Sequence, residues 1–132
     1  MAAAGISIPA DIAAAAKALG RNPETHHVLP WIFRDKFAHY GMNVNDAKYG
    51  SHVVGGANIV DNAGRKLAGT HQSWSKAYND NWREFLRNVN PVNSLDFIRQ
   101  VEDYARKLSR NPAFDGYGKA GTVEATGFPI NF

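Results

Sequence analysis

The 132-residue sequence contains no cysteine and no long hydrophobic run. The lack of cysteine excludes a disulfide scaffold, a thiolate metal site and a cysteine nucleophile. The longest apolar stretch, residues 12–16, is far too short to span a bilayer. No basic segment precedes it, so the sequence predicts neither a membrane anchor nor a signal peptide. We therefore expect no membrane partner.

Charge is also sparse, since only 20% of the residues are charged and 44% are hydrophobic. These fractions are close to globular averages and exclude a globally disordered chain. The length predicts one domain. The net charge of +3 permits a phosphate-rich partner without requiring one. Because cysteine is absent, the five histidines and the carboxylates are the good transition-metal ligands available.

Hydrophobic periodicity predicts a small α+β domain. We expect helices over residues 9–19, 31–40, 72–89 and from Ser94 to about residue 110, a strand over 24–29, a hairpin over 57–68, and an edge strand over 122–126. Ser94 is a good N-cap residue for its helix, and Gly64 suits the hairpin turn. Trp74, Tyr78, Trp82 and Phe85 recur at helical spacing, which favours a core face over a base-stacking platform.

Two adjacent histidines, His26 and His27, carry the most chemical information in the chain. Neighbouring side chains of a strand point to opposite faces. At a twisted strand end, however, two imidazoles can serve one site in different roles. One can bind a metal while the other takes a proton from water, because imidazole titrates near neutral pH. Taken alone, such a pair is more often structural or exposed than catalytic.

The surrounding motif resembles the HNH, or His-Me finger, nuclease superfamily, whose ββα-metal core begins with His-His-hydrophobic-x-Pro. A closer resemblance is to the branch found in bacterial polymorphic toxins and myxobacterial lipoprotein toxins. The matching positions are His26-His27-Val28-Leu29-Pro30, Phe33-Arg34, Phe37, Gly41, His71 and Asn79-x-x-Trp82-Arg83-x-Phe85. The match implies a nuclease core over residues 24–90, a helical arm over 1–23, and a C-terminal helix and glycine-rich tail over 91–132 packed on the same domain.

The resemblance implies a role for each histidine of the motif. His27 is the expected general base, and His26 is the expected metal ligand. His71 and Asn79 are the next candidate ligands, and His52 is a further one. These side chains would hold one divalent ion, either Zn, Mg, Mn, Ni or Co. The helix over residues 72–89 contains no histidine, so the paired-histidine spacing of many HNH helices is absent.

Basic residues near the motif are candidates for phosphate contacts, which position a nucleic-acid backbone without reading its sequence. The candidates are Arg34, Lys48, Arg65, Lys66, Lys76 and Arg83. Ordinary surface charge is the alternative interpretation, because these residues are scattered along the chain.

The resemblance implies a metal-dependent nuclease that hydrolyses phosphodiester bonds in DNA or RNA. It further implies the toxic C-terminal domain of a secreted antibacterial effector, which acts in the cytoplasm of a target bacterium and is blocked by an acidic immunity protein. One alternative is a non-enzymatic metal-binding or interaction domain that retains the finger fold. Another is a different metal hydrolase, for example one acting on the cell wall. The absence of a His-Glu-x-x-His signature counts against the last of these.

Overall fold

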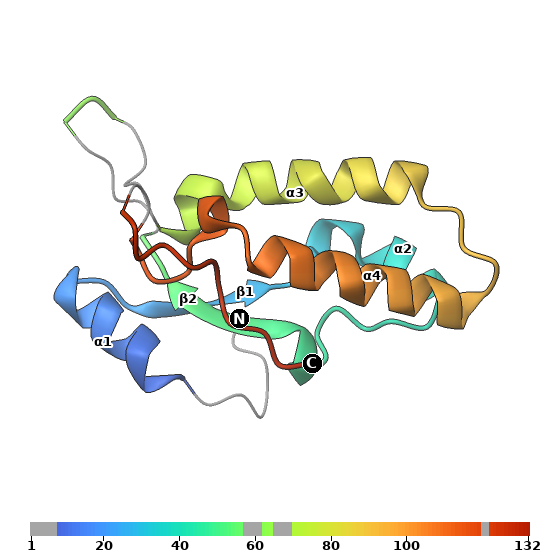
Figure 1. Ribbon diagram of the computed structural model, residues 1–132, viewed down its shortest axis with the longest axis horizontal. Coiled ribbons are helices and arrows are strands. Elements are labelled where there is room, and N and C mark those ends of the chain that lie inside the picture. The colour runs from blue at the N-terminus through green and yellow to red at the C-terminus, as the bar shows by residue number, and fades with distance from the viewer. Residues whose placement is uncertain (1–7, 57–61, 65–69, 120–121) are drawn as a thin grey trace.

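The computed structural model describes residues 8–56, 62–64, 70–119 and 122–132. Within these ranges the chain forms α1 (Ala10–Ala18), β1 (Pro23–His27), η1 (Trp31–Phe33), α2 (Arg34–His39), η2 (Ala47–Tyr49), β2 (Gly50–Val54), α3 (His71–Asn88), α4 (Ser94–Ser109) and η3 (Pro112–Phe114), shown in Figure 1. The η elements are single turns of 3-10 helix. The architecture is α+β, as the sequence predicts. In the part of the chain that is described, no helix has the length and apolar character needed to cross a bilayer.

The two strands pair antiparallel, with Thr25 opposite His52 and His26 opposite Ser51. In Figure 1 the strands lie between α1 on one side and α3 with α4 on the other. Helix α1 packs against both strands and buries Ile12 and Ala16. The sheet therefore separates two environments, and the strand register decides which side chains enter each one.

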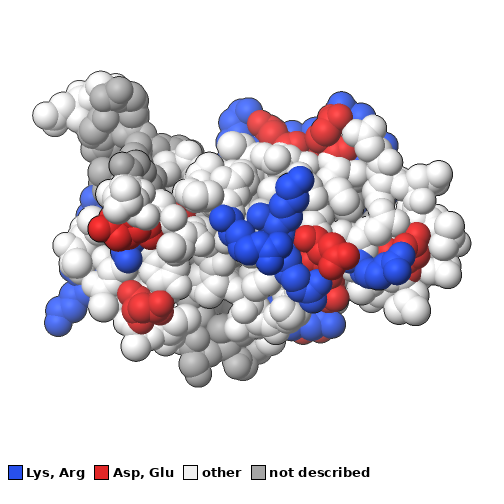
Figure 2. Space-filling model, viewed as in Figure 1, with Lys and Arg blue, Asp and Glu red and all other residues white. Residues whose placement is uncertain are grey.

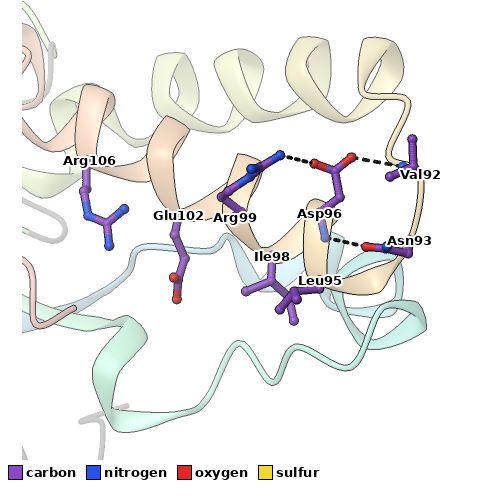
Figure 3. Close-up of a pocket in the computed structure, with 8 residues that line it drawn as sticks. All are labelled: Val92, Asn93, Leu95, Asp96, Ile98, Arg99, Glu102 and Arg106. Carbon is purple, nitrogen blue, oxygen red and sulfur yellow. Dashed lines mark hydrogen bonds and ion pairs between the residues drawn. The ribbon is translucent and has the colours of Figure 1, made fainter.

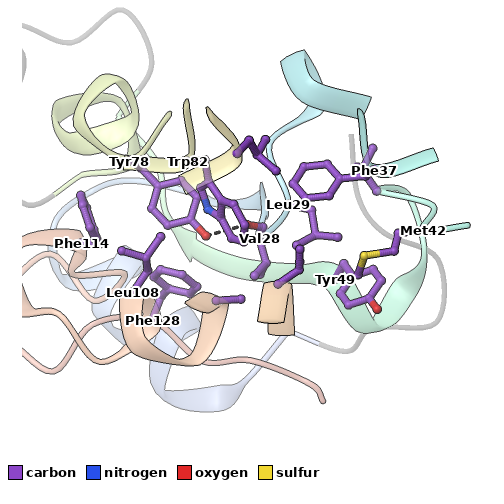
Figure 4. Packing of buried hydrophobic residues seen from close by; sticks show 14 of the residues in the cluster. Val28, Leu29, Phe37, Met42, Tyr49, Tyr78, Trp82, Leu108, Phe114 and Phe128 are labelled. Carbon is purple, nitrogen blue, oxygen red and sulfur yellow. Dashed lines mark hydrogen bonds between the residues drawn. The ribbon is translucent and has the colours of Figure 1, made fainter. Parts of the chain in front are cut away.

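The main core lies on the α3 and α4 side of the sheet (Figure 4). Trp74, Tyr78 and Trp82 are buried along one face of α3, which confirms the core face expected from their spacing. The hydroxyl of Tyr78 donates a 2.6 Å hydrogen bond to the carbonyl of Val28, directly after β1. Burial raises the pKa of Tyr78 far above its ordinary value, so the phenol stays protonated and keeps donating this bond. The contact holds α3 against the C-terminal end of β1, which carries His26 and His27.

Most of the predicted helices are present, with two local differences. Helix α1 matches the predicted residues 9–19, and Gly20 follows it with φ +65°. Residues 31–40 form a 3-10 turn followed by α2 rather than one helix. The N-cap of α4 is Asn93 and not Ser94, because Asn93 Oδ1 accepts a 2.8 Å hydrogen bond from the backbone N–H of Asp96.

The predicted edge strand over residues 122–126 is wrong. Thr122 begins a turn there, closed by a hydrogen bond from Ala125 N to Thr122 O. The backbone N–H of Val54 donates instead to the carbonyl of Gly116, so another part of the tail lies beside β2. Of the predicted hairpin over 57–68, only residues 62–64 are described, and Gly64 there has φ +79°.

Candidate functional site

His26 lies inside the core at the end of β1 and is only 3% exposed. Its ring makes edge contacts with Trp74, Tyr78 and Phe128, at centroid distances of 4.9, 4.5 and 4.7 Å. Burial lowers the pKa of His26 well below its ordinary value of 6.5, and the neighbouring His71 and His27 lower it further. The imidazole is therefore neutral at physiological pH, which is the protonation state that can donate an electron pair.

A relay of side chains leads from His26 out to Glu24. His26 Nδ1 lies 3.0 Å from His71 Nε2, and His71 Nδ1 lies 2.7 Å from Glu24 Oε1. Gln72 also donates from its amide to Glu24 Oε1. The hydrogen bond from His71 lowers the pKa of Glu24, so this carboxylate is ionised and accepts. It holds the proton of neutral His71 on Nδ1 and turns the Nε2 lone pair toward His26.

The far nitrogen of His26 has an unusual environment. Nε2 is buried and has no hydrogen-bond partner among the described residues. In the relay, His26 donates through Nδ1–H to His71, so its Nε2 carries a lone pair. His26 Nδ1 and His71 Nε2 could both donate an electron pair to a metal ion only if the His26 proton lay on Nε2. There the aromatic rings of Trp74, Tyr78 and Phe128 surround it.

His27 is more exposed than His26 and is oriented by a different residue. Its Nε2 lies 2.9 Å from Asn45 Oδ1, in the loop between α2 and η2. Because an amide oxygen can only accept, this contact places the proton of neutral His27 on Nε2. Nδ1 then keeps its lone pair and is the nitrogen that can take a proton from water.

A cavity of about 180 Å³ brings these side chains together. It is lined by Thr25, His26, His27, Pro30, Trp31, Ile32, His71, Ser75, Tyr78 and Asn79. Four of the five residues expected to act as base or metal ligands therefore share one site, although 45 residues separate His26 from His71. Glu24 and Asn45 are the site residues that the sequence analysis did not identify. Glu24 could have been found from its place two positions before His26, on the same strand face. Asn45 has no local signal.

His52 is the predicted ligand that the structure does not bring to the cavity. It is 6% exposed and lies in β2 opposite Thr25. Val53 points into the main core. Since neighbouring side chains of a strand point to opposite faces, His52 points away from that core. Its face is the one turned toward α1.

The chemistry of a metal site is present in part. In the part of the chain that is described, no group of three or more histidine, aspartate or glutamate side chains could hold a metal ion. His26 Nδ1 and His71 Nε2 nevertheless lie 3.0 Å apart, a separation that suits two neighbouring positions on an ion with bonds of about 2.1 Å once the His26 proton lies on Nε2. A carboxylate behind a ligating histidine, as Glu24 is behind His71, is a common support of metal ligands. Two imidazoles with the Asn79 amide and water fit a divalent ion.

The predicted phosphate contacts divide into two groups. Arg34 lies next to the cavity, because its guanidinium carbon lies 3.5 Å from the ring centroid of Trp31, which lines the cavity. Arg83, Lys76 and Lys48 instead have acidic neighbours. Arg83 and Lys76 lie 2.7 and 2.9 Å from Asp80, and Lys48 lies 3.9 Å from Glu102. Figure 2 shows the same mixture of basic and acidic side chains over α3 and α4. Arg65 and Lys66 lie outside the described residues.

A larger concavity, of about 570 Å³, lies along the outer side of α4 (Figure 3). Its lining residues are Val92, Asn93, Leu95, Asp96, Ile98, Arg99, Glu102 and Arg106. Asp96 is already bound there by the backbone N–H of Val92 and by Arg99. No histidine lines it. Asn93 caps α4, and Glu102 accepts a 2.7 Å hydrogen bond from the hydroxyl of Tyr49.

Comparison of the chain with protein-family models, with curated proteins and with solved structures finds no match. Its function must therefore be inferred from the geometry of its own residues.

Proposed function

We propose that this chain is a metal-dependent nuclease with a ββα-metal core formed by β1, β2 and α3. The observation that carries the proposal is the shared cavity, in which the partly exposed His27 lies beside the relay of His26, His71 and Glu24. Asn45 holds one nitrogen of His27 and leaves the other to accept a proton, while His26 and His71 bring two ring nitrogens within 3.0 Å of each other. This division of roles is what the resemblance to the His-Me finger nucleases implies.

In this proposal His27 activates the attacking water. Asn45 keeps the proton on Nε2, so Nδ1 accepts a proton from water as the oxygen attacks phosphorus. The bond from phosphorus to the leaving oxygen breaks, and that oxygen takes up a proton from solvent. Arg34, which stacks on Trp31 at the cavity, holds a neighbouring phosphate.

His26 and His71 would hold the divalent ion, with Asn79 and water completing the set. Glu24 fixes the tautomer and orientation of His71, and the aromatic cage fixes the ring of His26. A divalent ion bound there would stabilise negative charge on the scissile phosphate and on the leaving oxygen. Imidazole ligands suit Zn, Mn, Ni or Co, and a water-rich set suits Mg.

The wider setting belongs to the same proposal. The nuclease would act on DNA or RNA as the toxic C-terminal domain of a secreted antibacterial effector, in the cytoplasm of the target cell. The net charge of +3 and Arg34 beside the cavity favour an acidic immunity protein as the natural inhibitor, because complementary charge speeds and orients association.

One observation favours a second candidate function, a metal-binding or interaction domain without catalysis. The described residues contain no cluster of three histidine, aspartate or glutamate ligands, so the ion would be held by fewer strong ligands than in many hydrolases. In that case the cavity would bind metal, yet His27 would have no catalytic role.

Plasmid cleavage separates the two functions. We expect cleavage by the wild-type chain with added divalent metal, loss of cleavage with a chelator, and loss in His27→Ala. His39→Ala is the matched control, because His39 is an exposed histidine of α2 that does not line the cavity. Asn45→Ala should cleave more slowly while it binds metal normally. Full cleavage by a folded His27→Ala chain would exclude His27 as the base, and metal binding without any cleavage would favour the second function.

A further inference from the structure

Trp31 stands apart from the other tryptophans of the chain. It is 50% exposed, whereas Trp74 is 5% and Trp82 is 0% exposed. It follows Pro30 and begins η1, only four positions after His27, and both residues line the same cavity. Single exposed apolar side chains are common, but the adjacent Trp31 and Ile32 are each 50% exposed and both line the candidate site, and a contiguous apolar patch of this kind marks a contact surface.

The indole is held in place by Arg34. The guanidinium carbon lies 3.5 Å from the ring centroid, and Arg34 Nη1 donates a 3.2 Å hydrogen bond to the Trp31 carbonyl. The ring is thus stacked on one cation and anchored through its own backbone, yet half of the residue remains accessible. An aromatic surface that is already ordered loses little conformational freedom when a planar group stacks on it.

The size of the cavity limits what can enter it. About 180 Å³ is below the roughly 300–1,000 Å³ of sites that enclose drug-sized ligands. A phosphate group with its neighbouring water fits, but the attached nucleosides must lie outside. The exposed side chains on the rim are Trp31 and Ile32, each 50% exposed. The base next to the scissile phosphate therefore meets an apolar surface that includes an indole.

We propose that Trp31 is a positioning residue that stacks on the nucleobase beside the cleaved phosphate, and that the site consequently prefers single-stranded nucleic acid. This inference rests on the proposed nuclease function. A base inside a duplex has both faces covered by its neighbours, whereas an unpaired base can leave the stack and place one face on the indole. Arg34, stacked on Trp31, adds positive charge next to the phosphates of the same strand.

Binding of a short oligothymidylate to the full chain tests the inference, with chelator present so that no cleavage occurs. The matched ligand is an abasic strand with the same number of phosphates. We expect oligothymidylate to quench the fluorescence of the wild-type chain, because Trp31 is the exposed tryptophan. In Trp31→Ala its affinity should fall between about fivefold and about 150-fold, the range that corresponds to stacking of one base.

Two controls separate stacking from a general apolar or electrostatic effect. Ile32→Ala removes an equally exposed neighbour without a π face and should leave oligothymidylate affinity nearly unchanged. The abasic strand should bind the wild-type chain and Trp31→Ala equally, because only phosphates are available. A duplex of the same length should bind the wild-type chain more weakly than oligothymidylate does.

Equal affinity of wild type and Trp31→Ala for oligothymidylate would overturn the inference, as would equal losses in Trp31→Ala and Ile32→Ala. A parallel plasmid assay keeps the two proposals apart. Cleavage without a Trp31 effect overturns the stacking role alone. Absence of both binding and cleavage overturns the nuclease function and the stacking role with it, and leaves the apolar rim as a protein contact surface.

Discussion

His26 Nδ1 and His71 Nε2 lie 3.0 Å apart, although the two residues are 45 positions apart in the chain. The contact joins the end of β1 to the first residue of α3. The hydroxyl bond from Tyr78 to the carbonyl of Val28 holds the same two elements together two turns further along α3. Core packing, rather than a loop, therefore positions His26 and His71 relative to each other. Sites built on packed helices and strands are held more precisely than sites on loops.

The first prediction compares His71 with His52 as a metal ligand. His71→Ala removes one of the two converging imidazoles and should greatly reduce metal affinity in calorimetric titration. His52→Ala should leave the affinity within a few-fold of wild type, since His52 points to the other side of the sheet. Circular dichroism checks that both variants fold. Loss of metal binding in His52→Ala alone would move the metal site to the opposite face of the strands.

The second prediction concerns the carboxylate behind His71. Glu24→Gln keeps the size of the side chain but removes the charge that holds the proton on His71 Nδ1. We expect metal affinity to fall by about 10- to 100-fold, as for other supports of ligating histidines. Glu124→Gln, at an exposed position that does not line the cavity, is the control. Identical affinities for the two variants would show that Glu24 does not act through His71.

The third prediction concerns the core. Trp82 is 0% exposed and packs edge-on against Phe37 and Tyr104, at centroid distances of 5.5 and 5.0 Å. Trp82→Ala should lower the free energy of unfolding by about 3–5 kcal/mol, as measured by urea denaturation. Val92→Ala, at a side chain that is 85% exposed, should change it by less than about 0.5 kcal/mol. Similar denaturation midpoints for the two variants would place Trp82 outside the core.

The fourth prediction is a pH dependence of stability in the metal-free chain, measured with chelator present. The pKa of His26 is lowered in the folded state, so below its ordinary value of 6.5 the unfolded chain binds a proton that the folded chain does not. Stability from this group is complete above pH 6.5 and is lost as the pH falls toward the lowered value. The slope is up to about 1.4 kcal/mol per pH unit.

His26→Phe is the matched variant for this measurement, because the surrounding rings of Trp74, Tyr78 and Phe128 can accept another aromatic side chain. Its free energy of unfolding should depend less on pH than that of wild type, because the proton that unfolded His26 takes up as the pH falls below 6.5 is missing in the variant. His39→Phe, at an exposed position, should keep the wild-type dependence. Parallel pH profiles for wild type and His26→Phe would mean that His26 titrates normally in the folded chain.

The sequence predicts the elements whose signals are local. The spacing of Trp74, Tyr78 and Trp82 predicts α3 within one residue at each end. Apolar residues that recur with a period of 3.6 positions form one face of a helix, and this pattern is sufficient to define a buried helix. The sequence predicts the N-cap of α4 one residue too late, since Asn93 and Ser94 are both good capping residues. The strand expected over 122–126 is absent because the hydrogen bonds of the tail depend on which segment reaches β2.

For the candidate site, the sequence alone determined which residues have the right chemistry: the adjacent His26 and His27, and a further imidazole at the start of a helix. Only the tertiary structure decided which of them meet. The register of β1 on β2 turns His52 away from His26, and a loop far along the chain brings Asn45 to His27. Burial, which sets the charge of His26, likewise depends on neighbours from α3 and the C-terminal tail. Local patterns encode the period of an element, whereas strand register and the packing of distant segments depend on the free energy of the whole core.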